Sequence, residues 1–453
     1  MYLPVALLAF CLCASAYGAL MPQLPGAPAV SFRQYAGYFD VGENKGHHLH
    51  YWFTESQADP ANDPLLLFLY GGPGCSGMAA SLTEWGPYRL NSDGKTLQIN
   101  EFSWNNNANV LILEAPAGVG YSYTDDGNVA TNDDKTAEEN WEALCEFFKK
   151  FSEFHPNDFY ITGESYAGIY VPTLADVILK RQNVFQMNLK GLFIGNGLTS
   201  QKLNIDTTMQ FEYDHGMVSE SLWQRAKYEC CNQDTDGCAF HSFTGTGFCA
   251  SFVKNVTMNV WTSGVNPYDI YDSCSGEAAQ KATLSQRFQV DHFHATGLPA
   301  PAHLEVVNCI DEHAVNAYLN IPAVRKAFFV STKVGDYESC SLDVTTHYTK
   351  QSQEMGSIIK NAIASGVRVY LYHGDVDSAC NFMMGQRFSA TLGVAKVSNK
   401  QEYYVNGQIG GYYTAYNGLE FATVRGAGHV VPAYKPDVAL HILSRYLKGQ
   451  SPV

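Results

Sequence analysis

The stretch Phe159–Gly168 (FYITGESYAG) is the part of this chain that indicates its fold most clearly. Its first part, Phe159–Thr162, is an apolar and β-branched run typical of a buried strand, and a helical pattern follows Gly168. Between strand and helix, Ser165 stands in a Gly-x-Ser-x-small pattern, with Ala167 where the strict pattern has glycine. Because a serine on such a tight turn has an exposed hydroxyl, the stretch predicts a catalytic nucleophile at Ser165.

Two later loops supply the partners that a nucleophilic serine needs. Val367–Tyr372 has the pattern of a buried strand and leads into Asp375 and Asp377, and Phe421–Val424 leads into His429. Alone, either aspartate is more often a turn residue, and the histidine is as often a surface group. The order serine, acid, histidine, with acid and histidine on loops after late core strands, is that of the α/β-hydrolase fold. The order therefore predicts a catalytic triad, and the spacing leaves either aspartate as its acid.

Strand-like runs alternate with helical patterns along most of the chain. The strand-like runs are Leu65–Leu69, Val110–Leu113, Phe159–Thr162, Leu192–Ile194, Val367–Tyr372 and Phe421–Val424. Helical patterns such as Thr136–Phe151 and Asp437–Lys448 predict the covering helices. We therefore expect an α/β-hydrolase fold with a doubly wound, mostly parallel central sheet, formed by 24–200 and 342–453. The alternation breaks down over 201–341, where many cysteines, aromatics and glycines predict an inserted disulfide-rich cap.

The start of the chain and its charge indicate the compartment. Val5–Phe10 is an apolar run and Ala14–Ala16 a small-residue cleavage site, which together predict a signal peptide over about 1–18. The absence of Lys and Arg before the apolar run leaves the cleavage point open. We expect the secretory pathway, with a lysosomal or extracellular destination, and no membrane span. The net charge of −15 argues against nucleic acid and anionic membranes as partners.

Cysteine usage agrees with export. Six of the twelve cysteines lie between Cys230 and Cys309, a density that favours disulfides over metal, although the spacing leaves their pairing open. Cys145 falls on the apolar face of a helix that a capping box, Thr136 and Glu139, is expected to begin, so we expect a buried free thiol. A glycosylation sequon at Asn255 predicts a surface site in the cap.

Long motifs of this sequence resemble the serine carboxypeptidase family. They are Gly71–Ser76, Glu114–Tyr123, Gly163–Gly168, Gly195–Gly197, Gly374–Phe382 and Gly426–Pro432. The resemblance runs from Leu24 to the C-terminus. It implies a Ser-His-Asp mechanism in which Asp377 is the acid, with an oxyanion hole formed by the backbone N–H groups of Gly72 and Tyr166.

The resemblance also implies a site for the free carboxylate of a peptide. The family uses two glutamates, matched here by Glu84 and Glu164, and an asparagine, which is replaced here by Tyr70. Two adjacent carboxyls cannot both ionise cheaply, so one keeps a proton in acid and can donate to the substrate. The simpler interpretation of Glu84 is a solvated helix charge. Cys380 and Tyr268 match positions that line the substrate pocket of the family.

Four disulfides are implied by the same resemblance. They are Cys75–Cys340, Cys230–Cys249, Cys231–Cys238 and Cys274–Cys309. Cys145 and Cys380 then remain as free thiols. We expect no metal and no cofactor, because the histidines of His47-His48-x-His50 and His292-x-His294 lack the carboxylate or thiolate partners that a metal site needs.

The sequence thus predicts an acid serine carboxypeptidase that removes C-terminal residues from peptides with a free C-terminus. Two alternatives stay open. The first is an acyltransferase or esterase on the same scaffold, which Tyr70 favours. The second is a protective binding partner of other lysosomal hydrolases, although a complete triad argues against a purely passive role. A homodimer and an association with other lysosomal hydrolases are further partners left open.

Overall fold

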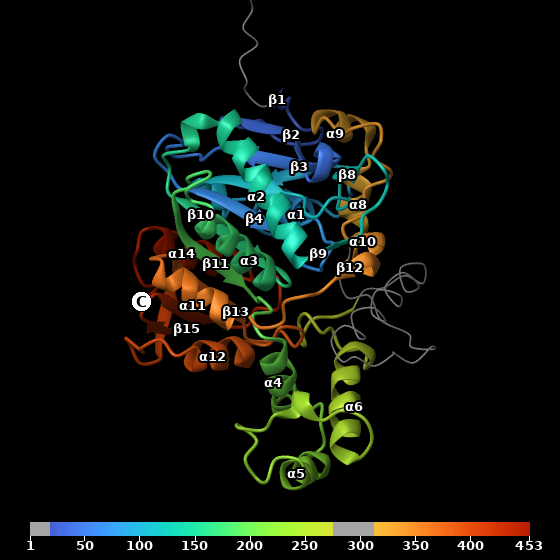
Figure 1. The fold of residues 1–453 in the computed structure, drawn as a ribbon, viewed down its shortest axis with the longest axis vertical. Coiled ribbons are helices and arrows are strands. Elements are labelled where there is room, and N and C mark those ends of the chain that lie inside the picture. The colour runs from blue at the N-terminus through green and yellow to red at the C-terminus, as the bar shows by residue number, and fades with distance from the viewer. Residues whose placement is uncertain (1–18, 275–311) are drawn as a thin grey trace, which may run out of the picture.

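A computed structural model describes residues 19–274 and 312–453 of the chain (Figure 1). The expected signal peptide, Cys309 and the pair His292-x-His294 lie outside the described residues. The strands are β1 Ala19–Leu20, β2 Gln34–Val41, β3 His47–Thr54, β4 Leu65–Leu69, β5 Tyr88–Leu90, β6 Leu97–Ile99, β7 Asn109–Leu113, β8 Tyr123–Thr124, β9 Thr131–Asn132, β10 Phe159–Glu164, β11 Leu189–Gly195, β12 Tyr348–Thr349, β13 Arg368–Gly374, β14 Gln401–Val405, β15 Gln408–Tyr416 and β16 Leu419–Val424. The α-helices are α1 Gly77–Ala80, α2 Asp133–Lys150, α3 Ala167–Lys180, α4 Gln201–Asp214, α5 Glu220–Glu229, α6 Phe248–Thr262, α8 His313–Leu319, α9 Pro322–Ala327, α10 Leu342–His347, α11 Gly356–Ala364, α12 Phe382–Thr391, α13 Val431–Tyr434 and α14 Pro436–Leu447.

One large mixed sheet forms the centre of the molecule (Figure 1). Its strand order is β1-β2-β3-β7-β4-β10-β11-β13-β16-β15-β14, with β8 beside β3. The neighbours from β7 to β16 pair in parallel, and the strands outside them pair antiparallel. All the predicted strand-like runs fall in this parallel centre, and Leu65–Leu69 coincides with β4. The expected doubly wound sheet is confirmed, with antiparallel edges that the sequence pattern did not predict.

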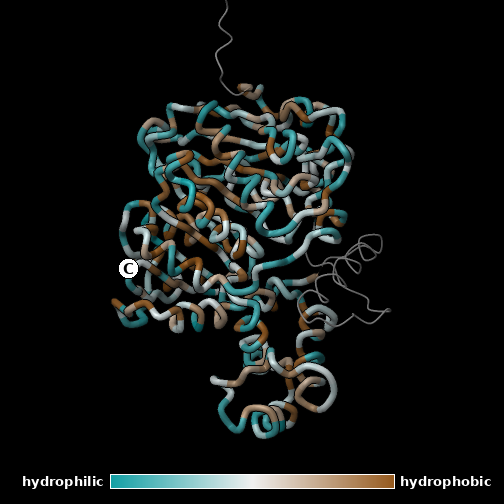
Figure 2. Tube along the Cα trace, viewed as in Figure 1, coloured by the Kyte–Doolittle hydropathy of each residue, from teal (hydrophilic) through white to brown (hydrophobic). Residues whose placement is uncertain are grey.

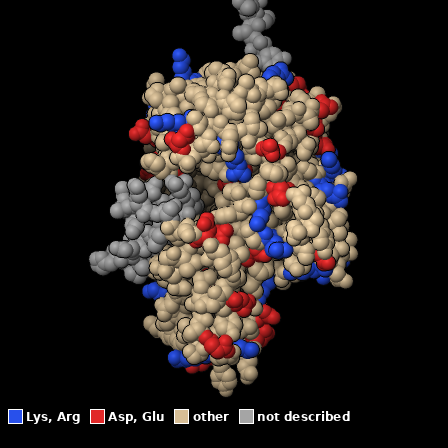
Figure 3. Space-filling model, turned by 180° about the vertical axis from the view of Figure 1, so that it is seen from behind, with Lys and Arg blue, Asp and Glu red and all other residues tan. Residues whose placement is uncertain are grey.

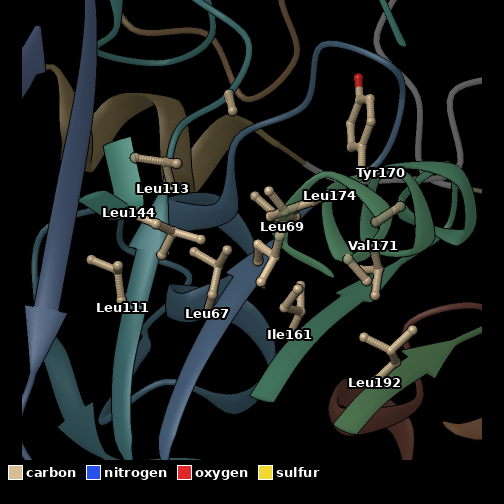
Figure 4. Close-up of a cluster of buried hydrophobic side chains, with 14 of the residues drawn as sticks. Leu67, Leu69, Leu111, Leu113, Leu144, Ile161, Tyr170, Val171, Leu174 and Leu192 are labelled. Carbon is tan, nitrogen blue, oxygen red and sulfur yellow. The ribbon is translucent and has the colours of Figure 1, made fainter. Parts of the chain in front are cut away.

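The sheet separates two hydrophobic cores because side chains alternate along each strand. On β4, Leu67 and Leu69 belong to the core under α2, α3 and α11, whereas Leu66 and Phe68 belong to the core that includes α14. Figure 4 shows the first core, where side chains of β4, β7, β10 and β11 meet those of α2 and α3. Figure 2 shows hydrophobic residues concentrated along these strands and helices. The strands buried on both faces explain the nearly continuous apolar runs of the sequence.

Helix α2 begins earlier than the sequence pattern predicted. Asn132 is its N-cap, and its side-chain oxygen accepts a hydrogen bond from the backbone N–H of Lys135 at 2.8 Å. The predicted capping box of Thr136 and Glu139 is therefore wrong, because both residues lie inside the helix and are buried. The prediction for Cys145 is confirmed, since it is a buried free thiol in the first core.

The segment predicted as a cap is not uniform. Helices α4, α5 and α6 extend away from the sheet (Figure 1), and α5 and α6 pack on one another around a small core of their own that includes Trp223 and Phe252. The disulfides Cys230–Cys249 and Cys231–Cys238 lie in this region. By contrast, Tyr318 and Val324 of α8 and α9 are buried in the second core of the sheet. The division into core and cap at 201–341 stays a prediction.

The helices and the surface charge bear on whether the protein could contact a membrane. Within residues 19–274 and 312–453, no helix is both long and apolar enough to cross a membrane. On the face shown in Figure 3, acidic and basic side chains are interspersed over the described part of the molecule.

Candidate active site

The candidate catalytic residues gather at one edge of the parallel sheet. Strands β4, β10, β11, β13 and β16 are consecutive neighbours in it. Tyr70 follows β4, Ser165 follows β10, Asn196 follows β11, Asp377 lies just beyond β13 and His429 just beyond β16. Because parallel strands end at the same edge, these residues meet at the carboxyl ends of the strands, where open α/β sheets bind ligands.

Ser165 occupies a strained turn between β10 and α3. Its φ of 65° lies in the left-handed region, which costs a non-glycine residue about 1–3 kcal/mol. The turn depends on small neighbours: a Cβ on Gly163 would lie 2.6 Å from the Cβ of Ala167. A Cβ on Gly168 would lie 2.4 Å from the backbone nitrogen of Leu198. Close packing of strand against helix therefore holds the half-buried Ser165 in its turn.

The segment Gly71–Gly74 after β4, which we name the glycine loop, lies directly against this turn. A Cβ on Gly71 would lie 2.4 Å from the backbone nitrogen of Tyr166 and 2.6 Å from the Cβ of Ser165. Gly72 has a φ of +113°, which side chains other than hydrogen rarely allow. The two expected oxyanion donors, the N–H groups of Gly72 and Tyr166, thus come from segments in contact. Sequence reasoning missed Gly71, whose need for glycine comes from this contact.

Asp377 and His429 form a buried pair. His429 Nδ1 lies 2.8 Å from Asp377 Oδ2, and both side chains are at most 4% exposed. The backbone N–H groups of Ala379 and Cys380 donate to the same carboxyl at 2.9 and 3.2 Å. The other candidate, Asp375, instead accepts from the backbone N–H of a glycine in the histidine loop at 2.7 Å. Of the two aspartates that the spacing had left open, Asp377 contacts the His429 ring, whereas Asp375 binds the backbone of the loop.

Asn196 links the serine turn to this pair. Its Nδ2 donates to Asp377 Oδ2 at 2.7 Å, and its Oδ1 accepts from the backbone N–H of Gly374 at 3.0 Å. Its neighbours Gly195 and Leu198 share backbone hydrogen bonds of 3.2 and 3.0 Å with Ser165. Sequence reasoning missed Asn196 as a site residue, although the Gly-Asn-Gly motif contained it.

Two buried carboxyls interact with one another, and one of them, Glu164, directly precedes Ser165 in the chain. Glu84, on the π-helical turn Ser81–Trp85 (η2), is 2% exposed, and Glu164 is 1% exposed. The Glu84 carboxyl interacts electrostatically with both Glu164 and Tyr70. Burial raises the pKa of Glu84 to about 8. Burial and then the Glu84 charge raise the pKa of Glu164 well above its usual value. The interpretation of Glu84 as a solvated helix charge is wrong, because the side chain is buried.

Arg89 is a cation that interacts electrostatically with Glu84. One of its nitrogens donates to the carbonyl of Thr83 and another to the carbonyl of Pro432, the latter at 2.8 Å. Its positive charge opposes the rise in the pKa of Glu84. Arg89 therefore joins η2 to α13, the short helix that follows His429. No motif pointed to it, and its contact with Pro432 joins residues that are distant in sequence.

The two expected pocket residues lie at the triad. Cys380 is a buried free thiol whose pKa is raised by burial and by the charges of Asp377 and Glu164. Tyr268 accepts a hydrogen bond at its carbonyl from the backbone N–H of His429 at 2.7 Å. Its ring centre lies 5.2 Å from that of the His429 imidazole.

The remaining predicted features are placed as follows. The disulfide Cys75–Cys340 joins the glycine loop to the segment before α10, and Cys274 is disulfide-bonded. Asn255 is exposed on α6. Among the described residues, no group of three or more His, Cys, Asp or Glu side chains could hold a metal ion.

Comparisons with known proteins found a matching family and relatives of similar length. The serine carboxypeptidase family profile matches residues 22–449. The chain is 38% identical to the lysosomal protective protein of Mus musculus, over 94% of this chain and 93% of that protein. It is 35% identical to a serine carboxypeptidase of Caenorhabditis elegans, over 99% and 97% of the two chains.

The fold is shared with a solved structure. The prohormone-processing carboxypeptidase of Saccharomyces cerevisiae superposes with a TM-score of 0.73 at 22% identity, over 95% of each chain. This likeness confirms the α/β-hydrolase fold. With the family match over nearly the whole chain, the protein belongs to the serine carboxypeptidase family and is a serine-type carboxypeptidase.

Proposed function

We propose that this enzyme removes C-terminal residues from peptides by a Ser-His-Asp acyl-enzyme mechanism that acid favours. The observation that supports the proposal is the buried, interacting pair of Glu84 and Glu164, of which Glu164 directly precedes Ser165 in the chain. A nucleophile beside two carboxyls that hold protons is suited to a substrate whose scissile bond lies next to a free carboxylate.

In the first half of the reaction, Ser165 Oγ attacks the carbonyl carbon of the last peptide bond and His429 Nε2 takes its proton. Asp377, at 2.8 Å, holds the imidazole with Nδ1–H towards it and stabilises the imidazolium. The N–H groups of Gly72 and Tyr166 stabilise the oxyanion, each donor being typically worth about 10²–10³ in rate. The C–N bond then breaks, and His429 gives its proton to the departing amine. Water repeats the steps on the acyl-enzyme and restores Ser165.

Recognition of the substrate carboxylate is assigned to Glu84 and Glu164, with Tyr70 beside them. Below its pKa a carboxyl is protonated and can donate to the substrate carboxylate. Since the pKa of Glu84 is raised to about 8, this binding is present at acid and neutral pH and is lost as the pH rises through that value. The ionised pair then repels the substrate. Cys380 and Tyr268 are assigned to the walls of the substrate pocket.

A fluorophosphonate probe tests the nucleophile. It should label the protein once, at Ser165, and labelling should vanish in Ser165→Ala while the fold is kept. Full labelling of Ser165→Ala would sink the assignment. Matched labelling of Asp375→Asn and Asp377→Asn tests the acid, since only the second should react slowly.

A second function on the same scaffold is acyl transfer or ester hydrolysis. Tyr70 favours it, because a phenol ring stands where the family has a short amide. Ester and free-acid peptide substrates, compared at equal concentration, distinguish the two reactions. A protective association with other hydrolases, a homodimer and glycosylation at the exposed Asn255 are further proposals. The disulfides fit the secretory pathway, and we propose a lysosomal or extracellular destination.

A further inference from the structure

The buried carboxylate of Asp133 has no part in the steps above. It is fully buried at the first residue of α2. Its Oδ1 accepts hydrogen bonds from the hydroxyls of Tyr166 and Tyr348, both at 2.8 Å. Its Oδ2 accepts from the backbone N–H groups of Gln351 and Ser352 at 2.6 and 2.7 Å. A carboxylate with two donors on each oxygen is held firmly and holds its partners in turn.

One of these partners is the proposed oxyanion donor. Tyr166 is fixed at its backbone by the serine turn and at its phenol by Asp133. The ring between these ends is 3% exposed and packs edge-on against Tyr170 and Tyr348, with centroids 5.2 and 5.8 Å away. Lys350 Nζ lies 5.2 Å from the ring centre. The position of the Tyr166 N–H is therefore restrained from the far end of its own side chain.

The other proposed donor is held by the same stretch of chain, residues 340–352, which we name the brace. At one end of the brace, the disulfide Cys75–Cys340 and the backbone N–H of Ser341, which donates to Gly74 at 2.8 Å, hold the glycine loop. Thr345 Oγ1 donates to the carbonyl of Pro73 at 2.8 Å. At its other end, the brace donates three hydrogen bonds to Asp133.

We propose that Asp133 is a positioning residue of the oxyanion hole. By tying the Tyr166 side chain to the brace, it sets the spacing between the N–H groups of Tyr166 and Gly72. The inference rests on the proposed function, in which those groups bind the oxyanion. A misplacement of about 1 Å in a catalytic site can cost on the order of a hundredfold in rate, so a positioning role is measurable.

Two tyrosines offer a matched test, because both donate to the same oxygen of Asp133 over the same distance. Tyr166→Phe should lower kcat by about tenfold to a hundredfold with KM within about twofold, since the oxyanion exists only in the transition state. Tyr348→Phe should keep kcat within about threefold, because Gln351 and Ser352 still hold the brace. Equal losses of kcat in the two variants, or none in Tyr166→Phe, would overturn the inference.

The variant Asp133→Asn allows a second test of the proposal, by inhibitor binding. A peptide aldehyde forms a hemiacetal whose oxygen takes the place of the oxyanion, whereas an N-blocked amino acid resembles the product. Asp133→Asn should weaken aldehyde inhibition by the same factor as kcat and leave product affinity within about twofold. The double variant Asp133→Asn with Tyr166→Phe should be no slower than the slower single variant. A parallel loss of product affinity, or multiplied losses of rate, would mean that Asp133 acts only on the general structure.

Failure of the inference can be told from failure of the proposed function. If the function fails, fluorophosphonate still labels Ser165→Ala. If only the role of Asp133 fails, the label sits on Ser165, and Tyr166→Phe retains wild-type kcat and aldehyde affinity.

Discussion

The buried carboxyls of the site differ in how many hydrogen-bond donors each receives. Asp377 is buried but accepts hydrogen bonds from Asn196, from two backbone N–H groups and from His429. Glu84 is buried with far fewer donors, and its pKa is raised to about 8. Burial with few donors therefore favours a proton on Glu84. Asp377, by contrast, orients the His429 ring through its hydrogen bond.

At residue scale, Tyr70 tests how the carboxylate is recognised. Its phenol is longer and more rigid than an asparagine side chain, so it cannot take the place of a short amide without moving. We expect Tyr70→Asn to raise the preference for free-acid over amide dipeptides by about tenfold, roughly one hydrogen bond to a charged group. Tyr70→Phe, which keeps the ring, should not raise it. Steady-state kinetics decides, and an unchanged or lower preference in Tyr70→Asn would mean that the phenol already recognises the carboxylate.

Cys380 gives a second prediction at this scale. Because burial and two neighbouring acids raise the pKa of its thiol, bulky thiol reagents should inactivate the enzyme slowly, and faster as the pH rises. A product-like inhibitor should protect. Cys145→Ala is the matched control, since it removes the other free thiol and should stay sensitive. Cys380→Ala should be resistant, and equal sensitivity of the two variants would exclude Cys380.

At the scale of elements, the glycine loop and the serine turn pack so closely that a methyl group added at Gly71 should destabilise the fold. A Cβ at Gly71 would meet backbone at 2.4 Å, so Gly71→Ala should cost about 1–3 kcal/mol of unfolding free energy and reduce kcat. Gly335→Ala, where nothing lies within 4 Å of the new Cβ, should change neither. Thermal unfolding and kinetics compare them. Wild-type activity in Gly71→Ala would show that the two segments move apart freely.

The elements differ in how far the sequence predicts them. Central strands and the serine turn follow from local patterns, because burial on both faces produces unbroken apolar runs. The outer strands β2 and β14 did not stand out, because polar residues such as Asp40 and Glu402 interrupt their apolar runs. The start of α2 was misplaced because Thr136 and Glu139 imitate a cap that Asn132 provides. Asn196 and Asp133 were missed because their roles lie in contacts between elements that are separate in sequence.

For the whole molecule, the long disulfide should matter most to stability. Cys75 and Cys340 are 265 residues apart, and Cys231 and Cys238 are 7 apart. Chain entropy gives about 6 kcal/mol for the first loop and about 2 kcal/mol for the second. Replacing the first pair by serines should therefore lower the Tm more and also reduce kcat, since this bridge holds the glycine loop. A larger loss of Tm on removing the short bridge would contradict the account.

We propose that a buried pair of protonated carboxyls makes this enzyme an exopeptidase. KM measured against pH for matched free-acid and amide dipeptides tests this most directly. We expect KM for the free acid to rise as the pH passes about 8, where Glu84 loses its proton, while KM for the amide stays level. In Arg89→Met the rise should move to higher pH, because Arg89 lowers the pKa of Glu84, and Arg89→Lys should resemble the wild type. Identical profiles for the free acid and the amide would contradict the account.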